Sequence, residues 1–136
     1  MSVDGKLKIL IVEDDEFLSG MYVTKFTLEG FVVNFAGDGE EGLRKAREVQ
    51  PHLILLDVLL PKRDGFEVLQ ELKKDASTRS IPVILLTNLS QESDIKKGRE
   101  LGAEDYLVKA YNIPSEVVAK VKARLGISMS APHLPA

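Results

Sequence analysis

The chain has 136 residues, of which 44% are hydrophobic, and no cysteine, so it suits one domain with an ordinary apolar core and excludes disulfides and thiolate metal sites. Its formal net charge of −3 argues against direct nucleic-acid binding, because a nucleic-acid backbone is gripped by clustered Lys and Arg. No apolar run is long enough to span a bilayer and residues 1–8 hold no signal-peptide stretch, which together predict a cytoplasmic protein without membrane contact.

Short apolar segments alternate with amphipathic segments along the chain. The apolar segments have the length and β-branched composition of strands, and they are Leu7–Val12, Phe31–Phe35, Leu53–Leu56, Val83–Leu86 and Tyr106–Val108. The first, third and fourth are almost continuously apolar, which is typical of strands that are buried on both faces.

The segments between the expected strands have apolar residues at helical spacing. In the first segment, Phe17, Met21 and Leu28 form the expected apolar face. The corresponding residues of the later helices are Leu43, Ala46, Leu69, Leu72, Ile95, Gly98, Leu101, Val117, Val118, Val121 and Leu125. We therefore expect one domain over residues 6–126, followed by a flexible tail or truncated linker over residues 127–136.

Strict alternation of strands and helices predicts a parallel sheet with helices on both faces. Five units cannot close an eight-stranded barrel, which leaves an open sheet. The second strand ends in Ala36 and Gly37, without a functional group, which places it at the edge of the sheet. The predicted fold class is therefore α/β, a doubly wound, flavodoxin-like (βα)5 sandwich with strand order 2-1-3-4-5.

Functional side chains follow the other strands, at the edge where ligands bind in open α/β sheets. They are Glu13, Asp14, Asp15, Asp57, Thr87 and Lys109. We expect Asp14, Asp15 and Asp57 to share one pocket, where their mutual repulsion would be relieved by a hard divalent cation such as Mg²⁺. With Lys109 and Mg²⁺ the formal charges sum to zero, so this pocket could accept a phosphoryl group. In the alternative reading, Asp14 and Asp15 only cap the first helix.

Sequence motifs at the strand ends resemble those of response-regulator receiver domains, the chemotaxis-regulator-like modules of two-component phosphorelays. The matching segments, in order, are Ile9–Asp15, the spacing Asp57-x-x-x-Pro61-x-x-x-Gly65, Leu85–Thr87 and Gly102–Lys109. The resemblance covers residues 6–125. Each segment alone is a weak signal, whereas all of them in order are specific.

The resemblance implies a phosphoprotein in which Asp57 accepts a phosphoryl group from a histidine kinase or a histidine phosphotransfer protein. It also implies a Mg²⁺ site in which Asp15 binds the metal directly, Asp14 binds it through water, and the backbone carbonyl of Leu59 is a further ligand. The domain would be a regulator that assists its own phosphorylation and slow dephosphorylation, and not a conventional enzyme.

Thr87 and Lys109 would, by the same resemblance, bind the phosphoryl oxygens, and Tyr106 matches an aromatic residue that swings inward as the Thr87 hydroxyl moves. The surface of the fourth helix, fifth strand and fifth helix would then change and bind a downstream protein target. The sequence leaves open whether this surface also forms a homodimer.

The chain departs from the family pattern beside two of these residues. Ala110 follows Lys109 where the family usually has proline after a cis bond, so the loop either carries a cis bond costing about 3 kcal/mol or runs trans. Asn88 is larger than the usual residue after the threonine, and Leu59 and Leu89 would give the site an apolar rim. We therefore predict slow loss of the phosphoryl group.

Two other functions compete with the switch. A phosphatase with an aspartyl nucleophile usually has a second acid two residues later, where this chain has Leu59. A phosphorylation-independent interaction module would be favoured by loss of the acids or the lysine, yet all are present.

Nucleotide binding is disfavoured, because the chain has neither a Walker loop nor G-x-G-x-x-G after its first strand.

Overall fold

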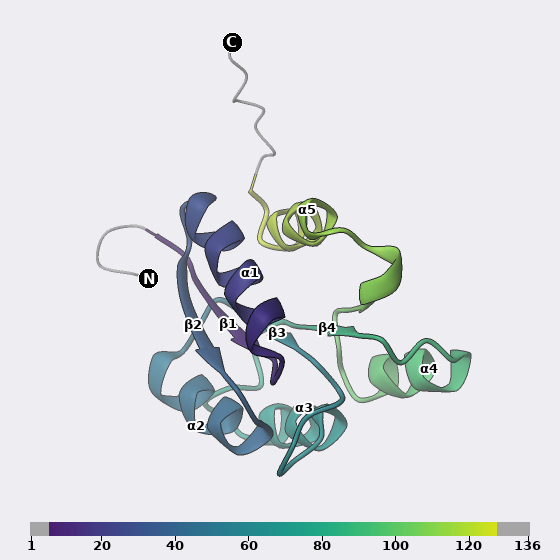
Figure 1. Cartoon of the computed structure of the whole chain (residues 1–136). Helices are drawn as coiled ribbons and strands as arrows, with labels where there is room; N and C mark the ends of the chain where they lie inside the picture. The colour runs from purple at the N-terminus through teal and green to yellow at the C-terminus, as the bar shows by residue number, and fades with distance from the viewer. Residues whose placement is uncertain (1–5, 128–136) are drawn as a thin grey trace.

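A parallel sheet runs through the computed structural model, which describes residues 6–127 (Figure 1). Its strands are β1 (Lys8–Val12), β2 (Val32–Ala36), β3 (Leu53–Leu56), β4 (Val83–Thr87) and β5 (Asp105–Val108). They pair in parallel in the order β2-β1-β3-β4-β5. The predicted fold class and strand order are confirmed, whereas most of the tail predicted over residues 127–136 lies outside the described residues.

Helices cover both faces of the sheet. They are α1 (Glu16–Leu28), α2 (Gly39–Val49), α3 (Gly65–Lys74), α4 (Glu92–Glu100) and α5 (Pro114–Arg124), with a short 3-10 turn η1 (Lys109–Tyr111) after β5. One core layer joins the sheet to α1 and α5, and the other joins it to α2, α3 and α4. Because β1, β3 and β4 contribute side chains to both layers, their continuous apolar sequences are explained.

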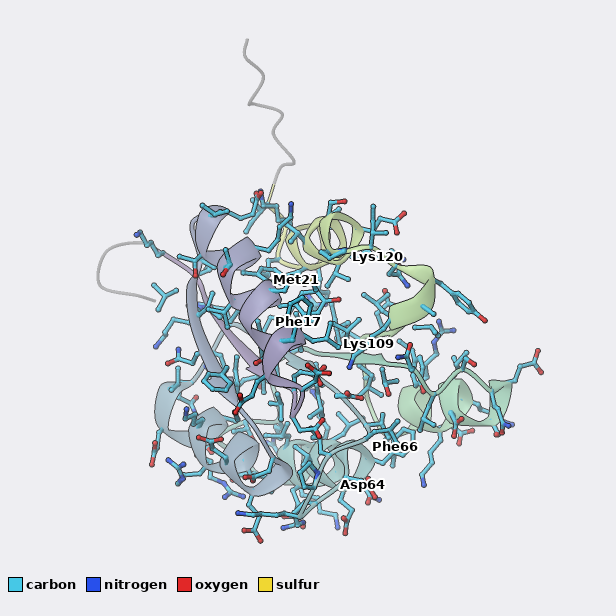
Figure 2. All side chains as sticks on the ribbon, viewed as in Figure 1. Phe17, Met21, Asp64, Phe66, Lys109 and Lys120 are labelled. Carbon is cyan, nitrogen blue, oxygen red and sulfur yellow. The ribbon has the colours of Figure 1, made fainter. Side chains whose placement is uncertain are left out.

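The face by which α1 packs differs from the prediction. Phe17 and Leu28 are 80% and 79% exposed, and Phe17 and Met21 are labelled on α1 in Figure 2. The helix is instead buried through Tyr22 and Phe26, and the Phe26 ring meets Phe31 edge-on at 5.5 Å between centroids. Since α1 has apolar residues on its outer side as well, spacing alone could not identify the buried face.

The carboxyl ends of β1 and β3 are level, which fixes the neighbours of the site. Val12 pairs with Leu56, and the backbone N–H of Asp57 donates to the carbonyl of Val12 at 3.0 Å. The next residues, Glu13 and Asp57, therefore leave the sheet side by side.

Gly65 lets α3 begin directly against the end of β3. A Cβ atom at this position would lie 2.2 Å from the carbonyl oxygen of Asp57 and 2.6 Å from the Cα of Val58. Backbone atoms cannot move far enough to make room for a side chain, so only glycine fits at position 65. This explains sterically why the motif that begins at Asp57 ends in glycine.

Candidate functional site

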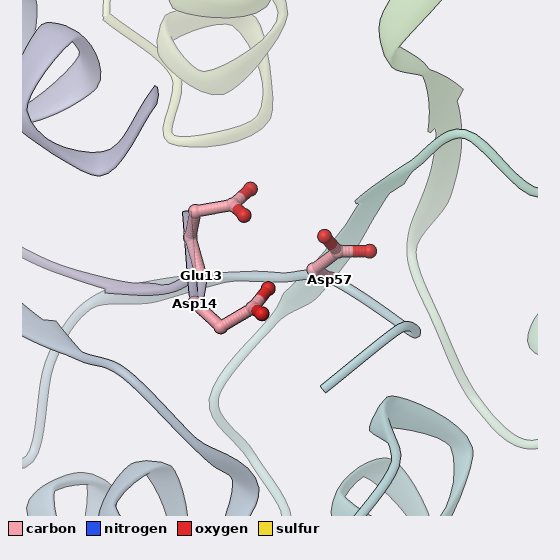
Figure 3. A group of neighbouring side chains, drawn as sticks. All are labelled: Glu13, Asp14 and Asp57. Atoms are coloured by element: carbon pink, nitrogen blue, oxygen red, sulfur yellow. The ribbon is translucent and has the colours of Figure 1, made fainter. Parts of the chain in front are cut away.

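Carboxylates from the ends of β1 and β3 form one group at the edge of the sheet (Figure 3). Glu13, Asp14 and Asp57 each offer an oxygen, and these oxygens all lie within 4.8 Å of one another. Glu13 and Asp57 are buried, at 4% and 5% exposure, whereas Asp14 is open to solvent. A cluster of this kind can hold a metal ion, because carboxylate oxygens are the ligands of hard divalent cations.

Lys109 is the cation that faces this cluster. Its Nζ donates to Asp57 Oδ2 at 2.7 Å and also to Glu13 Oε1. Burial alone would lower the pKa of Lys109, but the hydrogen bonds to Asp57 and Glu13 outweigh it and leave the pKa above its usual value. The ammonium group is therefore charged at neutral pH. Together with the three carboxylates it gives the group a formal charge of −2.

Glu13 is the least solvated acid of the group. Burial raises its pKa, although Lys109 and the backbone N–H of Asp15 both favour the ionised form. A positive ion in the cluster would relieve this cost of burial.

The expected grouping of Asp15 with Asp14 and Asp57 needs a correction. Asp15 is the N-cap of α1, where its Oδ1 accepts a hydrogen bond from the backbone N–H of Leu18 at 3.1 Å. Glu13 lies in the group in its place. The helix cap that the alternative reading expected is therefore present at Asp15, and the register of β1 with β3 is the signal that points to Glu13.

Both oxygens of Asp57 are hydrogen-bonded. Oδ2 accepts from Lys109, and Oδ1 accepts from the backbone N–H of Leu59 at 3.1 Å. The Leu59 side chain itself is exposed.

Thr87 ends β4 and is fully buried, and its hydroxyl accepts a weak hydrogen bond from the backbone N–H of Leu89 at 3.4 Å. Tyr106 in β5 lies inward, and its hydroxyl donates to the Leu89 carbonyl at 2.7 Å. The loop after Thr87 is therefore held from two sides.

The peptide after Lys109 is trans, because residues 6–127 contain no cis bond. Of the two alternatives left open by Ala110, the trans loop is the one observed, and it continues as η1. Asn88 accepts a hydrogen bond through Oδ1 from the backbone N–H of Ala110 at 3.1 Å. Its side chain thus joins the loop after β4 to the loop that carries Lys109.

The parallel, doubly wound sheet, the carboxylates at the ends of β1 and β3 and the lysine after β5 place the chain in the α/β class, with an acidic site that faces a lysine. The family described as "Response regulator receiver domain" matches residues 9–122, and the chain belongs to this family. Its members act as phosphorylation-activated switches in two-component systems.

Curated relatives and solved structures agree with this assignment. The chain is 42% identical over 118 residues to the "DNA-binding dual master transcriptional regulator RpaA" of Synechocystis, covering 87% of this chain and 48% of the relative. A CheY-like receiver domain from Methanospirillum hungatei superposes with a TM-score of 0.84 at 27% identity, over 90% of this chain and 95% of that one.

A Borrelia burgdorferi CheX–CheY complex with BeF3 and magnesium also contains a similar chain. The TM-score is 0.80 at 28% identity, over 88% of this chain and 89% of that one. The present chain spans about half the length of the curated relatives that it matches. Within residues 6–127, no helix has the length and apolar character that a membrane crossing requires.

Proposed function

We propose that Asp57 is the phosphoryl acceptor of this receiver domain and that a histidine kinase or a histidine phosphotransfer protein is the donor. The observation that carries the proposal is the position of the Asp57 carboxylate, which lies between the Lys109 ammonium group at 2.7 Å and the oxygens of Glu13 and Asp14. An ionised aspartate held in this way is a competent nucleophile.

Mg²⁺ is the cofactor that fits these residues. The donors would be carboxylate oxygens of Glu13, Asp14 and Asp57, which lie within 4.8 Å of one another. The backbone carbonyl of Leu59, expected from the family resemblance, is a further candidate ligand. One divalent cation would balance the remaining formal charge of the three carboxylates and Lys109. The relative in the Borrelia complex was solved with magnesium and BeF3, which supports the same chemistry here. When bound, the ion would neutralise charge on the incoming phosphoryl oxygens.

In the proposed reaction, an Asp57 oxygen attacks the phosphorus of a phosphohistidine, the P–N bond breaks, and an acyl phosphate forms. The histidine keeps the electron pair of the broken bond and takes up a proton from solvent. Lys109 exchanges its hydrogen bond to the carboxylate for one to a phosphoryl oxygen, and the Thr87 hydroxyl donates to another. Catalysis is mostly positioning and charge stabilisation, which these residues supply.

The output follows from a shift in population. A phosphoryl group that binds Thr87 favours one position of the loop after β4, and Tyr106 is bonded to that same loop. The surface of α4, β5 and α5 would change with it and bind a downstream protein, or a second copy of the domain. The exposed Leu59 and the partly buried Leu89 at the rim favour a long-lived acyl phosphate, and a half-life of only seconds would count against that part.

The test is the intact mass of the protein after incubation with acetyl phosphate, with and without Mg²⁺. We expect a gain of one phosphoryl group that needs Mg²⁺ and is lost in Asp57→Asn. Asp14→Asn should weaken Mg²⁺ binding, so that phosphorylation falls at a given Mg²⁺ concentration and needs more Mg²⁺ to recover. The matched control is Asp15→Asn, because asparagine also caps helices and Asp15 lies outside the carboxylate group.

Phosphorylation that persists in Asp57→Asn would contradict the assignment of the acceptor. An Asp15→Asn variant as defective as Asp14→Asn would show that the capping carboxylate is also needed, and would contradict a metal site made by the group of Glu13, Asp14 and Asp57 alone. Failure with both acetyl phosphate and a cognate kinase would refute the proposed function.

A further inference from the structure

Helix α4 rests on the sheet through a residue that has no side chain. Of the nine residues of α4, all of them described, Gly98 alone is buried. A Cβ atom at this position would lie 2.6 Å from Leu85 Cδ1 and 2.9 Å from Tyr106 Cδ2. Real Cβ contacts are not this short, so the backbone of α4 lies closer to these two side chains than any other residue type would allow.

Backbone conformation does not explain the glycine. Residues with positive φ are found elsewhere in the described chain, and Gly98 is not among them. Glycine is also the poorest helix former apart from proline, so α4 would gain helix propensity from alanine. The steric contact with Leu85 and Tyr106 is the remaining physical reason for glycine here.

The contact links α4 to the loop that follows Thr87. Tyr106 is 7% exposed, and its hydroxyl donates to the carbonyl of Leu89 in that loop. The ring atoms Cδ2 and Cε2 of Tyr106 are the ones that a Cβ atom at Gly98 would meet. The position of the helix, the inward position of the ring and the loop after Thr87 are therefore parts of one packed unit.

We propose that Gly98 is a positioning residue for Tyr106: by leaving room for the ring beneath α4, it keeps Tyr106 turned inward on the β4–α4 loop before any phosphorylation. The placement itself stands without the proposed function. Its consequence for signalling rests on that function, because it biases the population from which the phosphorylated form is drawn.

The buried state of the Tyr106 phenol gives a spectroscopic readout. The sequence has no tryptophan, so the fluorescence of the protein comes from its three tyrosines. Tyr22 and Tyr106 are buried, whereas Tyr111 is exposed and can be removed as Tyr111→Phe. Burial, with the charges of Asp94 and Asp57, raises the pKa of Tyr106 to about 12.

The experiment compares Gly98→Ala with Gly20→Ala in the Tyr111→Phe background. Gly20 is the matched control, because it lies inside helix α1 and a Cβ atom there meets nothing within 4 Å. We expect Gly98→Ala to increase quenching of tyrosine fluorescence by acrylamide at neutral pH, and Gly20→Ala to leave it unchanged. The titration of Tyr106 is identified as the one that disappears in Tyr106→Phe. Its pKa should fall from about 12 toward 10 in Gly98→Ala and stay unchanged in Gly20→Ala.

A functional readout completes the test. We expect the initial rate of phosphorylation by acetyl phosphate to fall several-fold in Gly98→Ala and to stay unchanged in Gly20→Ala. Unchanged quenching and an unchanged Tyr106 pKa in folded Gly98→Ala would overturn the proposal, since α4 would then have moved without the ring. Displacement of the ring at an unchanged phosphorylation rate would also overturn its link to the switch.

Two further arms keep the outcome decisive. If Gly98→Ala does not fold, Gly98→Ala/Leu85→Val removes the shorter contact and leaves the one with Tyr106, and the same displacement is expected there. If wild type itself gains no phosphoryl group, the proposed function fails, while the quenching comparison still decides the placement of Tyr106.

Discussion

Helices α1 and α4 flank the candidate site, and they are attached to the sheet in opposite ways. Helix α1 buries Tyr22 and Phe26, and its C-terminal Glu29 pairs with the largely buried Lys122 of α5. Helix α4 buries only Gly98 among its residues, with Ile95 packed partly against the core. The first helix is anchored by large buried side chains, whereas the second meets Tyr106 and Leu85 through Gly98 and adds only the partly buried Ile95 and a contact of Lys97 with the Phe66 ring.

This difference divides the molecule into a fixed part and a part suited to move. Removing α1 from the sheet would expose aromatic side chains, which costs several kcal/mol. Displacing α4 exposes little apolar surface of its own, so its position can follow Tyr106 and the loop after Thr87. The acidic group depends on the fixed part, because Asp15 caps α1 immediately after Glu13 and Asp14.

The largest expected effect concerns the anchor of α1. Phe26 is fully buried, so Phe26→Ala should lower the free energy of unfolding by about 3–5 kcal/mol through lost burial and the cavity that remains. Phe17→Ala on the exposed side of the same helix should change it by less than about 0.5 kcal/mol. Urea unfolding followed by far-UV circular dichroism measures both, and equal losses would mean that the buried face of α1 has been misassigned.

The same two helices show how far the sequence alone could lead. The strands were predictable because continuous apolar runs between helical segments have few other uses, and the strand order followed from which strands end without a functional group. The buried face of α1 was not predictable, because aromatic residues lie on both sides of the helix, Phe17 on the exposed side and Tyr22 and Phe26 on the buried one. Only contact with Phe31 and the sheet decides among them.

The site was predictable to the level of the strand ends but not of every residue. Asp57 and Lys109 were identified because each follows a strand at the edge where ligands bind, and they lie 2.7 Å apart. The choice between Glu13 and Asp15 needed the register of β1 with β3, which no single-strand pattern contains. The role of Gly98 was also hidden, because a glycine in a helical pattern carries no sign of what lies opposite.

The burial of Tyr106 beneath α4 can be tested through the pH dependence of stability. Because the pKa of Tyr106 is raised to about 12 in the folded chain against an ordinary 10, its contribution to stability is complete below pH 10 and is lost as the pH rises toward 12. The difference in unfolding free energy between wild type and Tyr106→Phe should therefore change by on the order of 2 kcal/mol over this window. Urea unfolding of both proteins at several pH values measures it, and parallel pH profiles would mean that the phenol is not buried under α4.

The smallest expected effect contrasts one glycine from each helix. Gly20→Ala should raise the free energy of unfolding by about 0.5–1 kcal/mol, because alanine restricts the unfolded chain and meets open space in the folded one. Gly98→Ala has the same gain in helix propensity but must displace Leu85 and Tyr106, so we expect a net loss of about 1–2 kcal/mol. The opposite signs are the informative part, since the two substitutions change the same atoms in the same kind of backbone. If both variants stabilise the protein, α4 moves aside at no cost when a Cβ atom is added at position 98. The close contact of Gly98 with Leu85 and Tyr106 would then not determine where α4 lies.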